Sequence, residues 1–440
     1  LLAVIMVTTN EADVLMRTSA ISGLAIALFA TRLLPEVVTA LGCFLAFLMV
    51  DAAPNAVIFS GFTSGGFWLL FAGLIVGTAI SVTGLGTQFA LRIFQKTGDS
   101  YIKAALLLAL SGLGLGLLVP ATMPRIIILM PVALSLSNTM GYEIGSRGHV
   151  GLTITGAIAT LLPTYAILTA NLPTIIHFGA FETLYDIKPS YARYFIEQAP
   201  ANAVRFIVLL VLMLPFAAAR SDTKSVLDAP MPFTYTQRKL LILLGSAILF
   251  WALDTFHGIS PAWVALLLAT VLLIPGFGIL DSNVMKTKID ISPAFFIAAV
   301  FAISAVAQHT GLGTVVADRL IPVLRLGDGS DLRDLYSVFG LSTVLSHLTT
   351  SPAAPAILAP LAGAIAAETG WSIETIAMAQ VLGISTPLLP YQAPPLIIAM
   401  ALAKIPMIAL LRVCLLLAMA VAVIGVPITY FWWSYLGMFL

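Results

Sequence analysis

The sequence has little charge for its length. Only 9% of its 440 residues are charged and 60% are hydrophobic, whereas soluble domains usually carry about 25% charged residues. This composition excludes an ordinary soluble protein and indicates a polytopic membrane protein. The formal net charge of +1 provides no strongly basic surface, so we expect no nucleic acid as a partner.

Cysteine, metal-ligand motifs and long polar segments are also scarce. Cys43 and Cys414 both stand in apolar segments, so we expect neither a disulfide nor a thiolate metal site. The five histidines are scattered and form no His-Glu-x-x-His motif. The longest polar stretches, 181–198 and 220–238, are too short for a nucleotide-binding domain. These absences argue against a metalloenzyme and against transport driven by ATP hydrolysis in this chain.

Apolar runs fall into two sets of five, one in each half of the chain. A bilayer crossing needs about 20 apolar residues, and the ten runs lie at 18–34, 36–52, 66–84, 149–170, 200–219, 239–253, 259–275, 290–309, 375–403 and 408–436. We therefore expect an all-α polytopic membrane protein built from two repeats. The expected organisation is an N-terminal segment at 1–17, a first repeat at 18–219, a central cytoplasmic loop at 220–238 and a second repeat at 239–436.

A longer apolar stretch interrupted by prolines follows the third run of each half. We expect 104–136 and 335–366 to be re-entrant helical hairpins, because non-helical backbone at membrane depth is tolerated only where it faces protein or a water-filled cavity. Pro131 and Pro360 are expected to close their second arms. The tips then consist of Ala121, Thr122, Met123, Thr350, Ser351 and Pro352.

The fourth run of each half is expected to be a broken helix. The first covers 149–176 with a break in LTANLPTIIHFG (168–179), and the second covers 375–403 with a break in LLPYQAPPLIIAM (388–400). Proline removes a backbone donor and ends a helix, which frees carbonyls to face a cation and amides to face an anion.

A short echo, TGLGT at 83–87 and again at 310–314, supports an internal duplication. Five crossings per repeat force the second copy to be inverted, and inverted repeats with broken helices are typical of secondary transporters.

The distribution of lysine and arginine favours an orientation with both chain ends outside the cell, following the positive-inside rule. With that orientation the inner loops hold Arg32, Arg92, Lys96, Lys103, Arg147, Arg220, Lys224, Arg238, Lys239, Lys286, Lys288 and Lys404, and the outer segments hold Arg17, Lys188, Arg193, Arg319, Arg325 and Arg333.

Two stretches and the hairpins resemble a known family. SGFTSGGFWLLFAGLIVGTAISVTGLG (60–86) and PLLPYQAPPLIIAMALAKI (387–405) are similar to the divalent anion:sodium symporters, which carry dicarboxylates, citrate or sulfate. The resemblance covers about residues 18–436. It implies a homodimer, a scaffold domain, and a mobile transport domain that moves like an elevator.

The sequence departs from this family at the residues expected to hold sodium. Relatives usually carry Ser-Asn-Thr at both tips, and this chain has neither copy; its literal Ser-Asn-Thr at 137–139 is expected to form a helix-end turn. The usual Thr-Pro-Pro-Asn is reduced to NLPT at 171–174 and APPL at 393–396. Candidate sodium ligands remain near Thr122, Asn171, Ser351 and Ala393, and no other metal or cofactor is expected.

Arg125 is the charge that stands out. It follows the first tip, near a helix N-terminus that disfavours a cation, and is costly there unless an anion lies beside it. The functional interpretation is that Arg125 and His347 supply positive charge to a dianion site. Alternatively, Arg125 pairs with a carboxylate such as Glu143 or reaches the cytoplasm, and His347 is a core histidine that donates to a carbonyl.

The expected function is secondary transport of small dianions such as succinate or malate, in a multi-pass protein of a bacterial inner membrane. The departures favour anion exchange, sodium symport is the alternative, and a channel is more remote. A hydrolase is not expected, because adjacent Ser346 and His347 point about 100° apart on a helix. The candidate substrate ligands are Ala121, Thr122, Met123, Arg125, Asn171, Pro173, His347, Thr349, Thr350, Ser351, Pro352, Gln392, Ala393 and Pro394.

Overall fold

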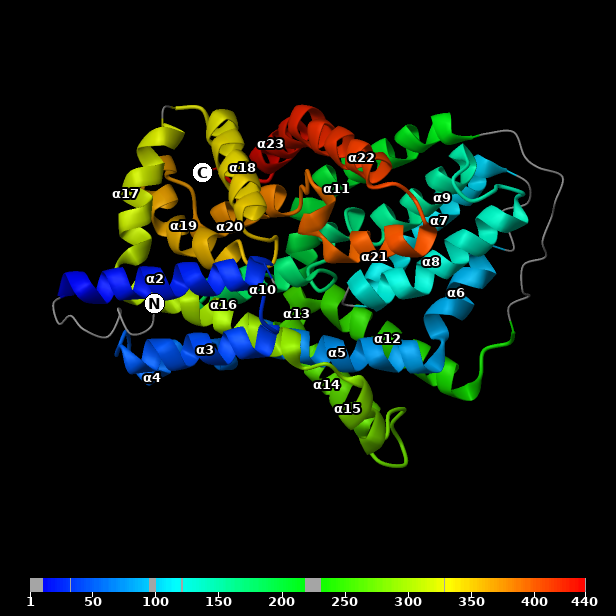
Figure 1. Ribbon diagram of the computed structural model, residues 1–440, viewed down its shortest axis with the longest axis horizontal. Helices are drawn as coiled ribbons and strands as arrows, with labels where there is room; N and C mark the ends of the chain where they lie inside the picture. Colours follow the sequence, from blue (N-terminus) through cyan, green and yellow to red (C-terminus); the bar gives the residue numbers. More distant parts are fainter. Residues whose placement is uncertain are drawn as a thin grey trace.

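The computed structural model describes residues 11–31, 33–94, 100–119, 122–217, 231–327 and 329–439. These residues form helices and connecting segments and contain no strand, which confirms the all-α fold class. Many of the helices run along the long axis of the molecule, and others cross it (Figure 1). The described helices that are long and apolar enough to cross a membrane unaided are Val14–Thr31, Gly65–Thr83, Tyr101–Leu118, Tyr191–Phe216, Ser292–His309 and Met407–Tyr435.

The two halves of the chain present their elements in the same order. The first half contains α2 (Glu11–Thr31), α3 (Glu36–Met49), α4 (Asn55–Ile58), η1 (Ser60–Thr63), α5 (Gly65–Thr83), α6 (Leu85–Phe94), α7 (Tyr101–Leu118), α8 (Thr122–Thr139), α9 (Arg147–Ala159), η2 (Pro163–Ala166), α10 (Leu172–Tyr185), α11 (Tyr191–Met213) and η3 (Leu214–Phe216). The second half contains α12 (Tyr235–Ala252), α13 (Asp254–His257), α14 (Pro261–Leu273), α15 (Ser282–Lys288), α16 (Ser292–His309), α17 (Leu312–Leu324), α18 (Asp331–Leu348), α19 (Pro355–Thr369), α20 (Ile373–Ile384), η4 (Pro390–Gln392), α21 (Pro394–Ala403), α22 (Met407–Ala420), η5 (Val421–Gly425) and α23 (Val426–Tyr435).

The TGLGT echo has the same structural role in both halves. Gly84 ends α5 with a φ of 65°, and Gly311 precedes α17 with a φ of 75°. Both angles lie in the left-handed region that glycine adopts without a Cβ penalty. The helix that follows each glycine, α6 or α17, contacts the second arm of the hairpin in its own half, α8 or α19. Neither of these two helices is predicted by the apolar runs.

The hairpins are α7 with α8 and α18 with α19, on opposite sides of the molecule (Figure 1). The expectation that Pro131 and Pro360 close the second arms is wrong, because α8 continues to Thr139 and α19 continues to Thr369. A helix can continue through a proline if it gives up one hydrogen bond and bends. α19 turns by 118° into α20.

The tips differ slightly from the sequence expectation. Thr122 and Met123 belong to the first turn of α8, and Ala121 lies outside the described residues. The second tip comprises the non-helical residues 349–354, which include Thr350, Ser351 and Pro352.

Both broken helices are present. α9 and α10 are separated by 160–171, with η2 between them, and α20 and α21 are separated by 385–393, with η4 between them. Pro173 stands in the first turn of α10, and Pro394 begins α21. A proline there removes an amide that would have no intrahelical acceptor, so it starts a helix at little cost. α10 continues beyond 176 to Tyr185.

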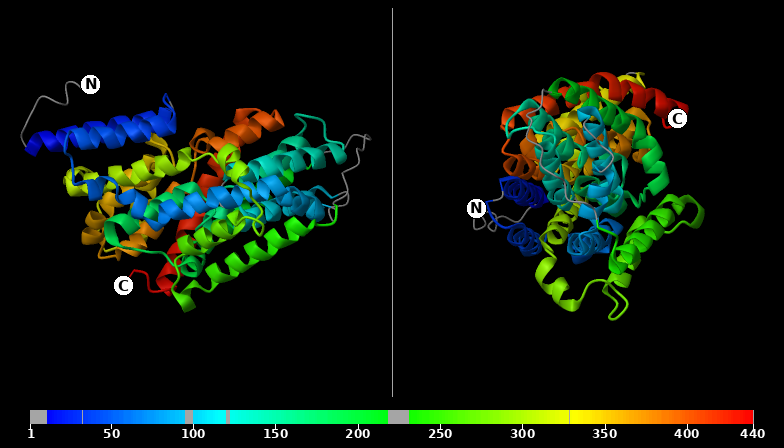
Figure 2. Two further views of the ribbon diagram at one scale, coloured as in Figure 1. Left: turned by 90° about the horizontal axis from the view of Figure 1, so that it is seen from below. Right: turned by 90° about the vertical axis from the view of Figure 1, so that its right-hand side faces the viewer.

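α10 lies between two groups of helices. On one side it contacts α5 and α16, which pack with α3 and α14; on the other it contacts α19 and α20. α12 lies at the edge of the bundle in both views of Figure 2. The first broken helix therefore connects the helices around the hairpins to the remaining bundle.

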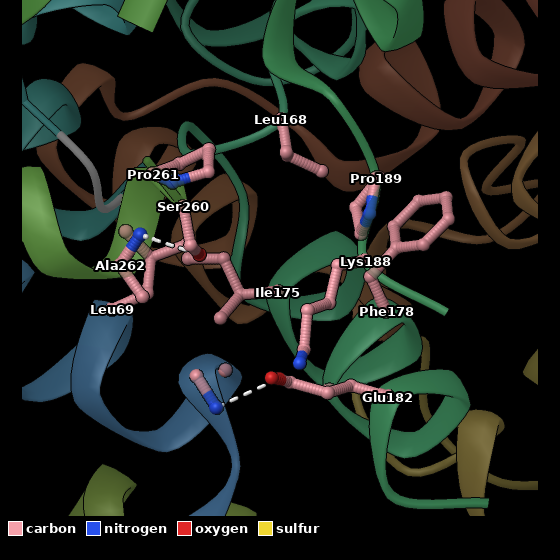
Figure 3. A pocket seen from close by; sticks show the side chains of 13 residues that line it. Leu69, Leu168, Ile175, Phe178, Glu182, Lys188, Pro189, Ser260, Pro261 and Ala262 are labelled. Atoms are coloured by element: carbon pink, nitrogen blue, oxygen red, sulfur yellow. Dashed lines mark hydrogen bonds between the residues drawn. The ribbon is translucent and has the colours of Figure 1, made fainter. Parts of the chain in front are cut away.

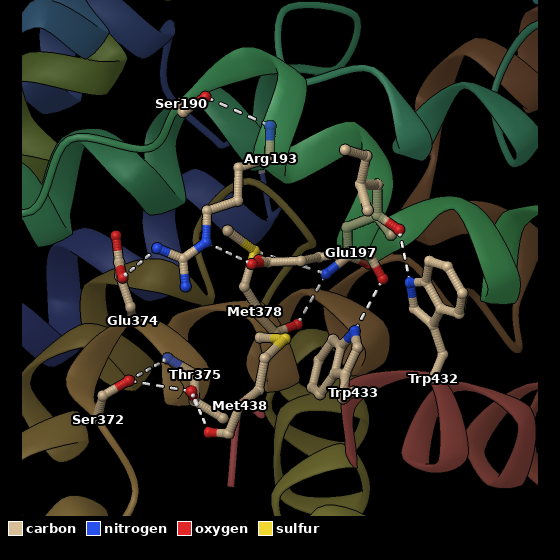
Figure 4. Close-up of polar contacts among 12 residues, drawn as sticks. Ser190, Arg193, Glu197, Ser372, Glu374, Thr375, Met378, Trp432, Trp433 and Met438 are labelled. Atoms are coloured by element: carbon tan, nitrogen blue, oxygen red, sulfur yellow. Dashed lines mark hydrogen bonds and ion pairs between the residues drawn. The ribbon is translucent and has the colours of Figure 1, made fainter. Parts of the chain in front are cut away.

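Two tryptophans of the C-terminal helix α23 donate hydrogen bonds to backbone carbonyls of α11 next to a proline. Pro200 lies inside α11 and cannot donate to the carbonyl of Ile196, four residues earlier. The indole of Trp432 donates to that carbonyl at 2.9 Å, and the indole of Trp433 donates to the next carbonyl, Glu197 O, at 2.8 Å. Figure 4 shows both tryptophans directed at this part of α11. The same region is tied to α20, because Arg193 forms ion pairs with the carboxylates of Glu197 at 2.6 Å and Glu374 at 3.0 Å.

Candidate functional site

Arg125 lies in the first turns of α8 and is completely buried. Its Nη2 donates to three oxygens at the first helix break: Thr122 Oγ1 at 2.8 Å, Ala170 O at 2.8 Å and Asn171 Oδ1 at 2.9 Å. The first hairpin is thereby bonded to the first broken helix. Arg125, Thr122 and Asn171, which the sequence named as candidate ligands, meet in one cluster.

Asn171 joins the parts of this cluster. Its Oδ1 also accepts from Thr122 Oγ1 at 3.1 Å, and its Nδ2 donates to Thr164 Oγ1 at 3.0 Å. Thr164 belongs to η2, whereas Asn171 directly precedes α10. One buried amide therefore connects the hairpin to both sides of the break.

The rest of the Arg125 guanidinium is unsatisfied. Nε and Nη1 are buried and have no hydrogen-bond partner among the described residues, which leaves three N–H donors without an acceptor. Gly116 on α7 provides the space, because a Cβ there would lie 3.0 Å from Nη1 and 2.6 Å from Thr164 Cγ2. Buried donors without acceptors cost about 1–3 kcal/mol each, and more when they are charged. An anion bound at this end would offset that cost.

Neither alternative for Arg125 occurs in this arrangement. Glu143 is exposed whereas Arg125 is buried, and no carboxylate among the described residues lies within ion-pair distance of the Arg125 guanidinium. The guanidinium points at the helix break and does not reach the surface.

His347, at the end of α18, joins the second hairpin to the second break. Its Nε2 accepts from Leu388 N at 3.0 Å, and its Nδ1 lies in hydrogen-bond contact with Thr343 O. A backbone N–H can only donate, so Nε2 carries no proton and Nδ1 is the donor, which makes the imidazole neutral. This geometry matches the core-histidine alternative and gives His347 no positive charge.

Two further candidate ligands have their polar groups satisfied within the protein. Gln392 donates from Nε2 to Ser346 O at 2.9 Å and accepts at Oε1 from Leu388 N at 3.1 Å. Thr349 donates back to Leu345 O at 2.7 Å. Gln392 therefore supports the second break in the way that Asn171 supports the first.

The remaining candidate ligands are small or apolar. Ser351 and Ala393 are buried, whereas Thr350, Pro352 and Met123 are partly buried. The side chain of Pro394 lies outside the described residues.

A second buried arginine, Arg205, was not among the candidate residues predicted from the sequence. Arg205 stands inside α11, within the predicted span 200–219, and is 1% exposed. Its Nη2 donates to Ser385 Oγ at 2.7 Å, Thr386 Oγ1 at 3.0 Å and Leu382 O at 3.3 Å. These acceptors stand at the end of α20, where the second helix break begins. The signal that could have found it is the charge itself, since an arginine inside an apolar span is costly and usually functional.

A separate, small pocket lies between α5, α10 and α14 (Figure 3). Glu182 on α10 accepts from Gly65 N at 2.7 Å and Ser64 Oγ at 3.2 Å, at the N-terminus of α5. Lys188 points towards Glu182 from the other side, and its hydrogen bond to Asp186 raises the pKa of its ammonium group. None of the candidate ligands lines this pocket, so it is distinct from the arginine cluster.

Comparisons with known proteins give the same overall picture. The sequence profile described as "Sodium:sulfate symporter transmembrane region" matches residues 1–439. A membrane protein of Cupriavidus necator is 22% identical over 349 residues, 76% of this chain and 68% of that protein. The L-tartrate/succinate antiporter of Escherichia coli strain K12 is 23% identical over 274 residues, 57% of this chain and 54% of that protein.

A solved structure shares the fold. The YdaH transporter of Alcanivorax borkumensis aligns with a TM-score of 0.61 at 17% identity, over 88% of this chain and 89% of that one. Because the family profile spans nearly the whole chain, the protein belongs to the sodium:sulfate symporter family, also called the divalent anion:sodium symporters, and is a multi-pass membrane transporter.

Proposed function

We propose that this protein exchanges small organic dianions, of the size of succinate or malate, across a bacterial inner membrane. The observation that carries the proposal is the half-satisfied guanidinium of Arg125. It is fully buried, Nη2 is bonded to the first helix break, and Nε and Nη1 have no partner among the described residues. A carboxylate is the small anionic group that best satisfies guanidinium donors.

The relatives support an organic dianion. One of them is named as an antiporter of L-tartrate and succinate, although its match spans only about half of each chain. The movement we propose is an elevator-like displacement of the hairpins, broken helices and α11 against α3, α5, α14 and α16, within a homodimer. α10 would then be the mobile helix that slides on α5 and α16, which it contacts.

We propose exchange without sodium because the side-chain oxygens at the first break already accept hydrogen bonds from Arg125. A sodium ion at this break would need Asn171 Oδ1 and Thr122 Oγ1, and both already accept from Arg125 Nη2. A fixed positive charge at this position makes movement of the empty carrier through the membrane costly, so the return step requires a second anion. The family description names sodium and sulfate, and sodium-coupled transport of a dicarboxylate or sulfate is therefore the second candidate.

The test is counterflow in proteoliposomes. Wild-type protein in sodium-free liposomes preloaded with succinate should take up labelled succinate, and Arg125→Ala should abolish this uptake. Arg412→Ala is the matched control, because Arg412 is exposed on α22. Uptake that requires sodium, or that Arg125→Ala leaves unchanged, would contradict exchange and favour the symporter.

A further inference from the structure

Arg205 repeats at the second helix break what Arg125 does at the first. In both residues a single Nη2 donates to one backbone carbonyl and two side-chain oxygens. For Arg125 these are Ala170 O, Thr122 Oγ1 and Asn171 Oδ1; for Arg205 they are Leu382 O, Ser385 Oγ and Thr386 Oγ1. Each break is thus held by one cation from a neighbouring helix, α8 for the first and α11 for the second.

The elements around the two arginines meet at the first helix break. Tyr194 on α11 donates to Tyr165 O, in η2 at the first break, at 2.6 Å. η2 contacts α11, which carries Arg205, and α7, which faces Arg125 through Gly116. Arg125 and Arg205 are both buried, so water screens their charges little.

The nearby buried acids do not neutralise this pair of charges. Glu197 is paired with Arg193 and lies two helical turns, about 12 Å, before Arg205 on α11. Asp254 binds Ser190 Oγ at 2.9 Å, at the start of α11. Asp334 accepts from Gly327 N at 3.1 Å, near the start of α18. Each acid is therefore engaged by other groups, and no ion pair joins any of the three to Arg125 or Arg205 among the described residues.

We infer that Arg205 is the second fixed charge of the carrier and that it makes the protein select doubly charged anions. This inference rests on the proposed function. Arg125 and Arg205 together place two positive charges in the low-dielectric core, and a bound dianion brings that sum to zero. A monoanion would leave one net charge inside the membrane, which is strongly unfavourable. Arg205 acts as a positioning and charge-balancing residue and need not touch the substrate.

The competing explanation is that Arg205 only caps α20. A cation near a helix C-terminus interacts favourably with the helix dipole, and Leu382 O belongs to the last turn of α20. Such a structural role predicts that any replacement weakens transport of dianions and monoanions equally. The charge-balancing role predicts that the two substrates change in opposite directions.

The experiment compares succinate with monomethyl succinate, which has a similar shape and one charge fewer. Both are assayed by sodium-free exchange in proteoliposomes containing wild type, Arg205→Gln, Arg205→Lys or the exposed control Arg412→Gln. The preference for succinate should fall at least about tenfold in Arg205→Gln, because an unmatched buried charge is costly. It should persist in Arg205→Lys and in the control. Parallel loss of both substrates, or equal loss of preference in the lysine and glutamine variants, would overturn the inference.

A measurement on the wild type keeps the inference testable if Arg205→Gln does not fold. A neutral loaded carrier moves no net charge, so the rate of succinate exchange should change less than about twofold when a potassium diffusion potential is imposed. A strong dependence of this rate on potential would contradict the charge balance. If the wild type exchanges no succinate without sodium, the proposed function fails, and this inference fails with it. If wild-type exchange occurs but the preference does not respond to Arg205, only the inference fails.

Discussion

Asn171 Oδ1 lies 2.9 Å from Nη2 of Arg125, so an amide occupies the position where a carboxylate would neutralise the buried arginine. The amide satisfies the donor but leaves the charge, and Nε and Nη1 of Arg125 have no hydrogen-bond partner in the described part of the chain. A neutral residue next to a buried cation costs stability, because it leaves the charge uncompensated. We attribute this arrangement to the need for an external anion.

Asn171→Asp should therefore abolish dianion exchange without unfolding the protein. The substitution retains the shape of the side chain and gives Arg125 a permanent ion pair, so the charge that we propose attracts the substrate is cancelled. We expect unchanged or higher thermal stability in detergent, together with loss of labelled succinate uptake.

Asn138→Asp serves as the control for this change, because Asn138 is exposed in the last turn of α8. It should retain wild-type uptake. Full activity of Asn171→Asp would show that the charge of Arg125 is not needed for substrate binding.

His347 should contribute no charge to transport. A proton added to Nε2 would face the N–H of Leu388, which currently donates to that nitrogen at 3.0 Å. Two facing donors are unfavourable, so the imidazole should remain neutral on mild acidification. His347→Asn should leave the shape of the pH profile of succinate exchange unchanged, even if the rate falls. An acid-stimulated component that this variant removes would show that His347 titrates during transport.

The sequence predicted the frame of the fold from apolar runs and proline positions. The two breaks were visible because Pro173 and Pro394 interrupt apolar helices, and Arg125 was visible as a charge in an apolar hairpin. The helix ends predicted at Pro131 and Pro360 were wrong, because a proline can also remain inside a helix that bends.

Partners across the fold could not be predicted, because they depend on how distant helices pack. The backbone N–H of Leu388 donates to His347 from 41 residues away in the chain. This contact favours the neutral imidazole, and it has no local sequence signal. The contacts of Arg205 with Ser385 and Thr386 join residues 180 and 181 positions apart in the chain. The arginine itself could have been found, whereas its position at the second break required the tertiary structure.

Gly179 and Gly66 should be essential for the contact between α10 and α5. A Cβ on Gly66 would lie 2.8 Å from Gly179 Cα, and a Cβ on Gly179 would overlap the ring of Phe301. Gly179→Ala should lower the free energy of unfolding by about 1–3 kcal/mol, because it overpacks the contact of α10 with Phe301 on α16. If α10 slides on α5 during transport, the rate of exchange should fall as well.

Gly77→Ala is the matched control for Gly179→Ala. Gly77 also lies in a helix, α5, but a Cβ there would meet nothing within 4 Å. Alanine should be tolerated at that position and should raise helix stability by up to about 1 kcal/mol. Thermal unfolding of the two purified variants in the same detergent separates the effects. Equal stabilities would contradict the close contact at Gly179.

The bond from Trp432 to Ile196 should matter only because Pro200 is present. The Ile196 carbonyl accepts from Trp432 Nε1 at 2.9 Å, since residue 200 has no N–H to offer. Trp432→Phe should lower the free energy of unfolding by about 1 kcal/mol, the usual value of one hydrogen bond.

In a Pro200→Ala background the restored N–H of residue 200 can donate to the Ile196 carbonyl, and the same Trp432→Phe change should then lower the free energy of unfolding by less. A double-mutant cycle on thermal stability should therefore give a coupling of about 0.5–1 kcal/mol. Strict additivity of the two changes would mean that Trp432 stabilises the protein by packing of its ring and not through the carbonyl that the proline leaves free.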